Sequence, residues 1–317
     1  MNLLLNGSLL LLLGLLSGKI VNKARFPAVT GYLLIGILIG PSFFNVLTHE
    51  MLRASIWVSH AALSLIAFSI GAQFTVRTLR RLGKSVLWIA FLEALGAAVV
   101  VTAVMFSIFK QTLPTALLFG AIASATAPAA TLMVVREYRA RGPLTDTLLA
   151  VVAIDDPICV MNFAIASGIA SMLLAGHVTS LGGMILRPVL EIGTAIVLGA
   201  VLGVGVSFIG ERLKTQAELL TFMLGAIFLG SGIALEANIS PLLVNMALGS
   251  TVGNIARRGE AMFDVIRSMD TPIYVAFFTL SGAGLHVELL RSVGLLGVAY
   301  LVARVAGKIL GAALGAS

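Results

Sequence analysis

Charged residues are scarce in this sequence: they make up 11% of its 317 residues, whereas hydrophobic residues make up 59% and the mean hydropathy is +1.05. A soluble domain could not bury so much apolar surface, so a soluble fold is excluded. The single cysteine, Cys159, cannot form an intrachain disulfide. We assign no metal site, because the four histidines are scattered near predicted helix ends: His49, His60, His177 and His286. Phosphate-binding, dinucleotide-binding and nucleophile motifs are also missing from the sequence, so we expect neither an enzyme nor a bound cofactor.

Long apolar stretches occur eleven times along the chain. We predict that each is a transmembrane helix, because backbone groups in lipid must be satisfied within the segment. The stretches are roughly residues 3–21, 26–44, 56–76, 86–109, 113–135, 144–174, 183–209, 217–235, 240–256, 269–287 and 292–315. The first has no basic region before it and no usual cleavage site after it, so we expect it to be retained. The predicted fold class is an all-α polytopic membrane protein embedded in the lipid bilayer.

The net charge of +7 could indicate nucleic-acid binding, but the basic residues follow a topological pattern instead. Fifteen lie in the loops after odd-numbered spans: Lys19, Lys23, Arg25, Arg77, Arg80, Arg81, Lys84, Arg136, Arg139, Arg141, Arg212, Lys214, Arg257, Arg258 and Arg267. Only four lie in the alternate loops: Arg53, Lys110, Arg187 and Arg291. Loops rich in lysine and arginine face the cytoplasm, so we predict an amino terminus outside and no nucleic-acid partner.

An internal repeat relates the third span to the tenth. At an offset of 211, the residues Gly71, Ala72, Val76, Leu79 and Arg80 correspond to Gly282, Ala283, Val287, Leu290 and Arg291. The second and ninth spans each contain a Gly-x-x-x-Gly pair, Gly36/Gly40 and Gly249/Gly253. Copies that begin seven helices apart have opposite orientations in the membrane, which is typical of secondary transporters. Small residues that only serve helix packing would give a similar pattern by coincidence.

A proline interrupts the fifth span within "ASATAPAATLMVV", residues 123–135, although residues 111–135 carry no charge. Pro128 removes a backbone donor and crowds the carbonyl of Ser124, which predicts a broken helix near Pro128. The hydroxyls of Ser124, Thr126 and Thr131 can satisfy the freed backbone groups. Half-helix ends at membrane depth bind ions in transporters, whereas a simple proline kink would only affect packing.

Two adjacent acids, Asp155 and Asp156, lie near the middle of the sixth span and are followed by Pro157. Each buried ionisable group costs roughly 2.5–3.5 kcal/mol on insertion scales, which indicates a function or a charged partner. The candidate partners are Arg304 and Lys308, which are four residues apart on one face of the last span. Lysine can lose its proton when it is desolvated and arginine effectively cannot, which favours Lys308 for proton exchange and Arg304 as a fixed charge.

Further polar residues could support this cluster. Glu93 is the only acid in the fourth span and corresponds to Arg304 at the offset of 211. Asn162 lies one or two turns beyond the acids and could supply another oxygen, although a packing role is also open.

The segment "ATAPAATLMVVREYRARGPLTDTLLAVVAIDD" resembles the core of the monovalent cation:proton antiporter-2 family, and is most similar to NapA-type sodium/proton antiporters. The resemblance implies that Asp156 binds the cation and, alternately, a proton, and that Thr126 lines the ion site. It implies that Asp155 pairs with a late lysine, matched to Lys308 by its Lys-x-x-Gly context, with Arg304 as the rival match.

The resemblance also implies the function and the domain organisation. We expect a homodimeric antiporter of the inner (cytoplasmic) membrane that exchanges sodium, lithium or potassium for protons. The expected domains are scaffold helices in 1–82 and 216–290, core helices in 83–175, a linker helix in 176–215 and the start of a second core half in 291–317. Since the family carries two further helices, we expect the second inverted repeat to be incomplete.

Two alternatives stay open at this point. A potassium/proton efflux protein of the Kef kind would share the fold, but such proteins usually present Gln-Asp at the acid pair. A non-transporting membrane sensor or structural fragment would lack the second half of the ion site.

Overall fold

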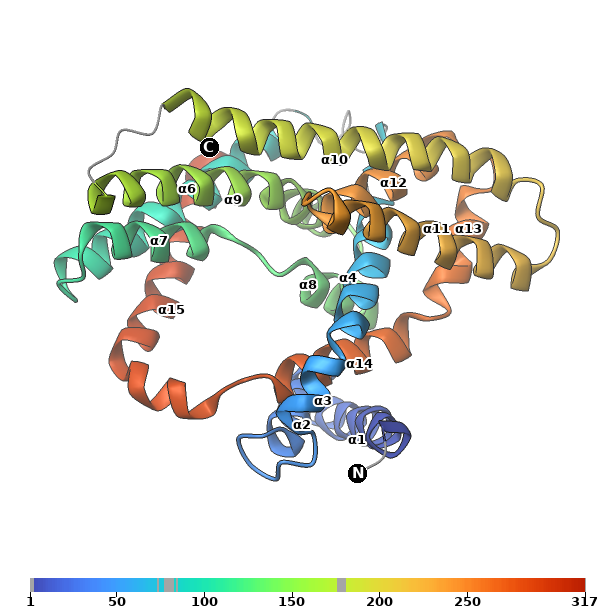
Figure 1. The fold of residues 1–317 in the computed structure, drawn as a ribbon, viewed down its shortest axis with the longest axis horizontal. Helices are drawn as coiled ribbons and strands as arrows, with labels where there is room; N and C mark the ends of the chain where they lie inside the picture. Colours follow the sequence, from blue (N-terminus) through green and yellow to red (C-terminus); the bar gives the residue numbers. More distant parts are fainter. Residues whose placement is uncertain (1–2, 73, 77–82, 84, 176–180, 317) are drawn as a thin grey trace. The chain divides into compact units, whose positions relative to one another are not determined.

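The structure is a computed structural model that describes residues 3–72, 74–76, 83, 85–175 and 181–316. All regular structure in these ranges is helical (Figure 1). The helices are α1 (Leu3–Lys23), α2 (Ala28–Ile39), α3 (His49–Ala54), α4 (Ile56–Gly71), α6 (Ser85–Ser107), α7 (Leu113–Ser124), α8 (Pro128–Glu137), α9 (Pro143–Ala175), α10 (Leu181–Gly210), α11 (Gln216–Glu236), α12 (Pro241–Ile255), α13 (Gly259–Arg267), α14 (Asp270–Ala283) and α15 (Val287–Ala316). Several residues used in the sequence analysis lie outside the described ranges: Arg77, Leu79, Arg80, Arg81, Lys84 and His177.

The predicted spans all correspond to helices, but four of them are shorter than the sequence suggested. Seven helical segments of the described chain are long and apolar enough to cross a membrane. The others, α2, α4, α12 and α14, have 12, 16, 15 and 14 residues. Prolines explain two of the starts, since Pro27 precedes α2 and Pro241 begins α12. The chain leaves α2 at Gly40, which is extended.

Two short helices occur in loops for which the sequence analysis predicted no structure. These are α3, and α13 between α12 and α14. The α13 helix buries Met262, Phe263 and Ile266 and leaves its other face polar, so its stability comes from packing on one side. Helix α15 is also less regular than predicted, because Gly294 has φ 47° and ψ −126°, and its apolar membrane segment is Val293–Ala316.

The chain divides into two compact units. The first contains residues 1–72, 129–140 and 198–292, and the second contains residues 73–128, 141–197 and 293–317. The division differs from the sequence-based domains at α8, which the first unit includes, and within α10, which the two units share. The functional domains expected from the resemblance therefore stay a prediction.

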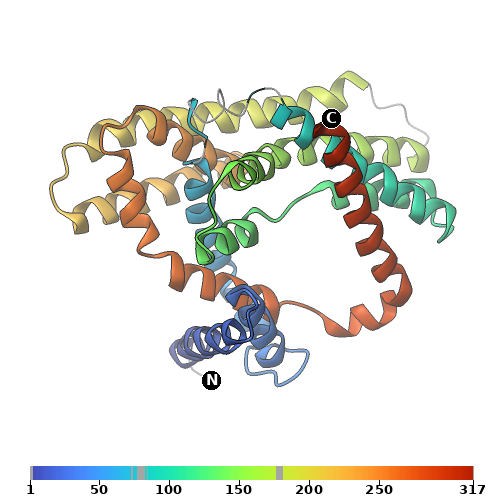
Figure 2. The same cartoon turned by 180° about the vertical axis from the view of Figure 1, so that it is seen from behind.

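In the first unit, the four short helices pack in two pairs, α2 with α14 and α4 with α12 (Figures 1 and 2). Glycines allow both pairs to approach closely. A Cβ at Gly282 would lie 3.0 Å from the Leu33 carbonyl carbon, and a Cβ at Gly71 would lie 2.9 Å from the Met246 carbonyl carbon. Because Gly71 and Gly282 are related by the offset of 211, the same type of contact occurs at corresponding positions of the predicted repeats.

The carboxyl-terminal end of α8 is attached to other helices of the first unit. Arg136 forms an ion pair with Asp270 at the start of α14, and both side chains are mostly buried. The Glu137 carboxylate accepts the Ala28 backbone N–H, 3.1 Å from each oxygen, at the first turn of α2. An acidic group at a helix amino terminus is stabilised by the helix dipole and by the free N–H groups. These contacts fix the position of α8 against α2 and α14.

The second unit is built from α6, α7, α9, the first part of α10 and the later part of α15. Helices α6 and α15 cross at glycines that face each other. A Cβ at Gly96 would lie 2.6 Å from the Gly307 carbonyl oxygen, and a Cβ at Gly307 would lie 2.7 Å from the Gly96 carbonyl oxygen. A Cβ at Gly311 would lie 2.8 Å from the Glu93 Cα. The two backbones are therefore in direct contact, and side chains beside the crossing are brought together.

Candidate ion site

The fifth predicted span is interrupted as the sequence indicated. Helix α7 ends at Ser124, Ala125 is extended with φ −62° and ψ 141°, and α8 begins at Pro128. Proline disfavours helical geometry in the residue before it, so the break at residues 125–127 follows from Pro128. The Ser124 hydroxyl donates to the Ala121 carbonyl at 2.7 Å, while Thr131 lies within α8. The break leaves carbonyl oxygens at the end of α7 without helical partners.

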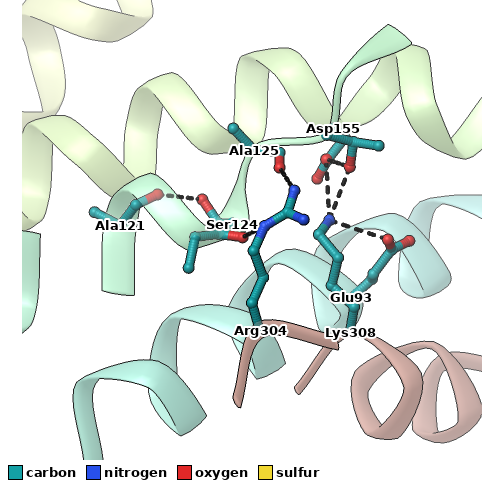
Figure 3. Close-up of polar contacts among 9 residues, drawn as sticks. Glu93, Ala121, Ser124, Ala125, Asp155, Arg304 and Lys308 are labelled. Carbon is teal, nitrogen blue, oxygen red and sulfur yellow. Dashed lines mark hydrogen bonds and ion pairs between the residues drawn. The ribbon is translucent and has the colours of Figure 1, made fainter. Parts of the chain in front are cut away.

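Arg304 satisfies two of these carbonyls. Its Nε donates to the Ala123 carbonyl at 3.1 Å, and its terminal nitrogen donates to the Ala125 carbonyl at 2.5 Å (Figure 3). A guanidinium carries several donors in a planar fork, which suits two adjacent carbonyls. The positive charge also complements the carboxyl-terminal end of the α7 dipole. Arg304 is therefore a cap of the broken helix and has no ion pair with the described acids.

Lys308, one turn further along α15, contacts the acids. Its Nζ lies 2.7 Å from the Thr126 hydroxyl oxygen, 3.1 Å from Glu93 Oε1 and 3.5 Å from Asp155 Oδ2. The Thr126 hydroxyl in turn donates to the same Asp155 oxygen. Figure 3 shows Lys308 between Glu93 and Asp155, with Arg304 beside it at the helix break. Of the two basic residues that the sequence left open as partners of Asp155, the structure brings Lys308 to it.

The acid pair has oxygen atoms that no described group satisfies. Asp155 is completely buried, and its Oδ1 has no hydrogen-bond partner among the described residues. The same holds for Oδ2 of Asp156, which lies next to it on α9. Helix α9 continues through Pro157, so the two carboxylates stay about 100° apart around one regular helix. Buried carboxylate oxygens without donors are costly, and such oxygens are ligands for hard cations.

The structure places the two possible supporting residues differently. Glu93, whose partner the sequence left undecided, pairs with Lys308. Asn162 lines an apolar groove with residues of α6 and α7, and no hydrogen bond joins it to the acids. The Glu93 pair could have been suspected, because an isolated acid in a membrane span needs a charged partner. Groups of three or more His, Cys, Asp or Glu that could hold a metal are absent from the described residues.

Comparison with known proteins decides the family. The model of the transmembrane sodium/hydrogen exchanger family matches residues 8–317. The chain belongs to the sodium/hydrogen exchanger family. The Asp155–Asp156 pair, Thr126 and Lys308 are thus part of a sodium/hydrogen exchanger fold, in its second compact unit.

Individual relatives of the exchanger chain are distant. An ammonium/H⁺ antiporter subunit of Alkalihalophilus pseudofirmus is 24% identical over 279 residues, which cover 87% of this chain and 69% of that protein. A Na⁺/H⁺ antiporter of Methanocaldococcus jannaschii is 29% identical over 187 residues, which cover 56% of this chain and 43% of the relative. The Na⁺/H⁺ antiporter NhaP of Pseudomonas aeruginosa is 29% identical over 151 residues, which cover 48% of this chain and 35% of that protein.

A solved structure of a related exchanger has the same fold. The sodium proton antiporter MjNhaP1 of Methanocaldococcus jannaschii at pH 8 superposes with a TM-score of 0.76 at 21% identity. The match covers 99% of this chain and 78% of that one. An electron-microscopy map of the same antiporter gives a TM-score of 0.82 over the same coverage. The antiporter fold expected from the sequence is thereby confirmed.

Proposed function

We propose that this exchanger is a secondary transporter that moves a monovalent cation and protons in opposite directions across the membrane by alternating access. The observation that carries this proposal is the aspartate pair beside a broken helix: Asp155 is buried, Asp156 is partly buried, and each has a buried oxygen that no described group satisfies. A purely structural acid pair would have its oxygens paired with donors. These oxygens are instead available to a cation or a proton.

The mechanism is competition for one site. The cation requires ionised carboxylates at Asp155 and Asp156, and protonation of the carboxylates releases it. Thr126 can offer its hydroxyl oxygen to the cation, and Lys308 balances the negative charge of Asp155 when no cation is present. Alternate occupation by cation and proton, combined with alternating access, couples the two opposed gradients.

The alternating movement would take place between core and scaffold helices. We infer that the scaffold helices in 1–82 and 216–290 form a homodimer interface and that the core helices carry the ion. The two glycine crossings of the first unit and the reciprocal Gly96/Gly307 contact support two inverted repeats. By the distribution of basic residues, the amino terminus would lie outside the inner (cytoplasmic) membrane.

The substrate is the least constrained part of the proposal. Sodium, lithium and potassium all remain candidates, and ammonium joins them because one relative is an ammonium/H⁺ antiporter subunit. The acid pair with Lys308 supports the NapA-type branch, whereas the named sodium/proton relatives are of the NhaP type. The Kef-type alternative is disfavoured by the aspartate at position 155.

The decisive experiment is exchange measured in proteoliposomes with an imposed proton gradient, with sodium, lithium, potassium and ammonium added in turn. Asp156→Asn should abolish cation-dependent proton movement, because an amide neither ionises nor carries the proton. The matched control is Asp146→Asn, in the first turn of the same helix, which should retain exchange. Full exchange by Asp156→Asn would remove Asp156 from the mechanism. A wild-type chain that exchanges no cation would favour the non-transporting alternative.

A further inference from the structure

Lys308 has two carboxylate neighbours, and the closer one is not part of the aspartate pair. Its Nζ is 3.1 Å from Glu93 Oε1 and 3.5 Å from Asp155 Oδ2, with the Thr126 hydroxyl at 2.7 Å. The side chains of Lys308 and Glu93 are 14% and 17% exposed, so both are largely removed from solvent. An ammonium has three N–H donors and can serve these neighbours together. Lys308 can therefore weaken its contact with Asp155 and still keep a carboxylate partner.

The backbone fixes Glu93 next to Lys308. The nearest approach of α6 and α15 brings Gly311, three residues after Lys308, against the Glu93 Cα. Gly96 and Gly307 make the corresponding contact one turn along each helix. Backbones in direct contact at two points have little freedom to slide or separate. The Glu93–Lys308 pair is thus built into the crossing and does not depend on the aspartates.

The balance of charge in this cluster requires a third acid. When all the groups are ionised, the three acids Glu93, Asp155 and Asp156 carry one more charge than the two bases on α15, Lys308 and Arg304, which leaves a single negative charge. One monovalent cation neutralises it. Without Glu93 the same cluster would be neutral before the cation binds and positive afterwards, which is costly in a medium of low dielectric constant.

We propose that Glu93 is a positioning residue that holds the Lys308 ammonium while the cation occupies the aspartates. This inference rests on the proposed function. Binding of the cation displaces the ammonium from Asp155, and Glu93 keeps it charged and paired nearby. Release of the cation lets the ammonium return to Asp155. Glu93 does not touch the cation, and it acts by weakening the competition between Lys308 and the cation for Asp155.

The test separates cation affinity from turnover. Glu93→Gln leaves Asp155 as the only carboxylate partner of Lys308 among the described residues, so the ammonium competes more strongly with the cation. We expect the KM for the cation in proteoliposomes to rise about tenfold or more, with kcat changed much less; tenfold corresponds to about 1.4 kcal/mol. Cation-dependent thermal stabilisation of the purified protein should shift to correspondingly higher concentrations. Glu288→Gln, an exposed glutamate at the start of α15, is the matched control and should change neither.

A second background distinguishes positioning from a direct or structural role. In Lys308→Gln there is no ammonium to hold, so adding Glu93→Gln should weaken the cation affinity no further. An equal weakening in both backgrounds, or an unchanged affinity in Glu93→Gln alone, would overturn the inference. If Glu93→Gln does not fold, Glu93→Asp tests the same point. It should raise the KM by a smaller factor, and it should not raise the KM when it is added to Lys308→Gln. A wild type whose stability does not respond to any cation would instead overturn the proposed function, and this inference with it.

Discussion

Arg304 closes the broken end of α7, so its removal should destabilise the break more than it alters the acids. Arg304→Met keeps an unbranched apolar stem in place of the arginine stem and deletes every donor, which leaves the Ala123 and Ala125 carbonyls without the guanidinium. A hydrogen bond to a charged group contributes about 1.5–3 kcal/mol. Because Arg304 is only half-buried, the lower value applies to each bond, and the two bonds together give about 3 kcal/mol.

The loss should be visible as thermal unfolding of the purified protein in detergent. With an unfolding entropy of about 2.1 cal/mol/K per residue, a change of about 3 kcal/mol corresponds to a fall of roughly 4–5 °C in the midpoint for a chain of 317 residues. Arg304→Lys should be intermediate, because one ammonium on a shorter reach cannot serve both carbonyls as the fork does. The control is Arg187→Met, an exposed arginine of α10, which should leave the midpoint nearly unchanged. An Arg304→Met midpoint no lower than that control would refute the capping role.

Two further contacts described above can be tested by substitution. Gly311→Ala places a Cβ 2.8 Å from the Glu93 Cα, so α6 and α15 must separate, and we expect the free energy of unfolding to fall by about 1–3 kcal/mol. The control is Gly225→Ala, where a Cβ meets nothing within 4 Å, and it should be neutral or stabilising. Equal effects of the two substitutions would count against the close crossing. Arg136→Gln and Asp270→Asn should each lower the free energy of unfolding. The double variant should lose at least about 0.5 kcal/mol less of this free energy than the two single losses added together. Strict additivity would show that this pair contributes little.

The sequence predicted those features that depend on local chemistry. Pro128 pointed to the break between α7 and α8, because a missing donor and a restricted preceding residue act within one turn, although helices α9 and α10 continue through Pro157 and Pro188. Runs of apolar residues likewise located every span. The lengths of α2 and α14 were overestimated, because apolar residues continue beyond the end of each helix, Phe43 and Phe44 after α2 and Leu285 and Val287 after α14.

Choices that depend on the crossing of distant helices could not be made from the sequence. Arg304 and Lys308 lie on the same face of α15, and either could have met Asp155. The rotation and depth of α15 against α6 decide between them, and these follow from glycine contacts that no periodicity reveals. The Glu93–Lys308 pair was missed for the same reason. The sequence contained all the partners but could not assign them to one another.

The reciprocal contact of Gly96 and Gly307 limits how the chain can change. At most packed positions, a larger residue on one helix can be compensated by a smaller one on its neighbour. Here each residue already has no side chain, and each would direct its Cβ at the carbonyl oxygen of the other. A substitution at either position therefore cannot be rescued by a second change at the other. Second-site suppressors of such variants would have to arise where the helices can shift as a whole.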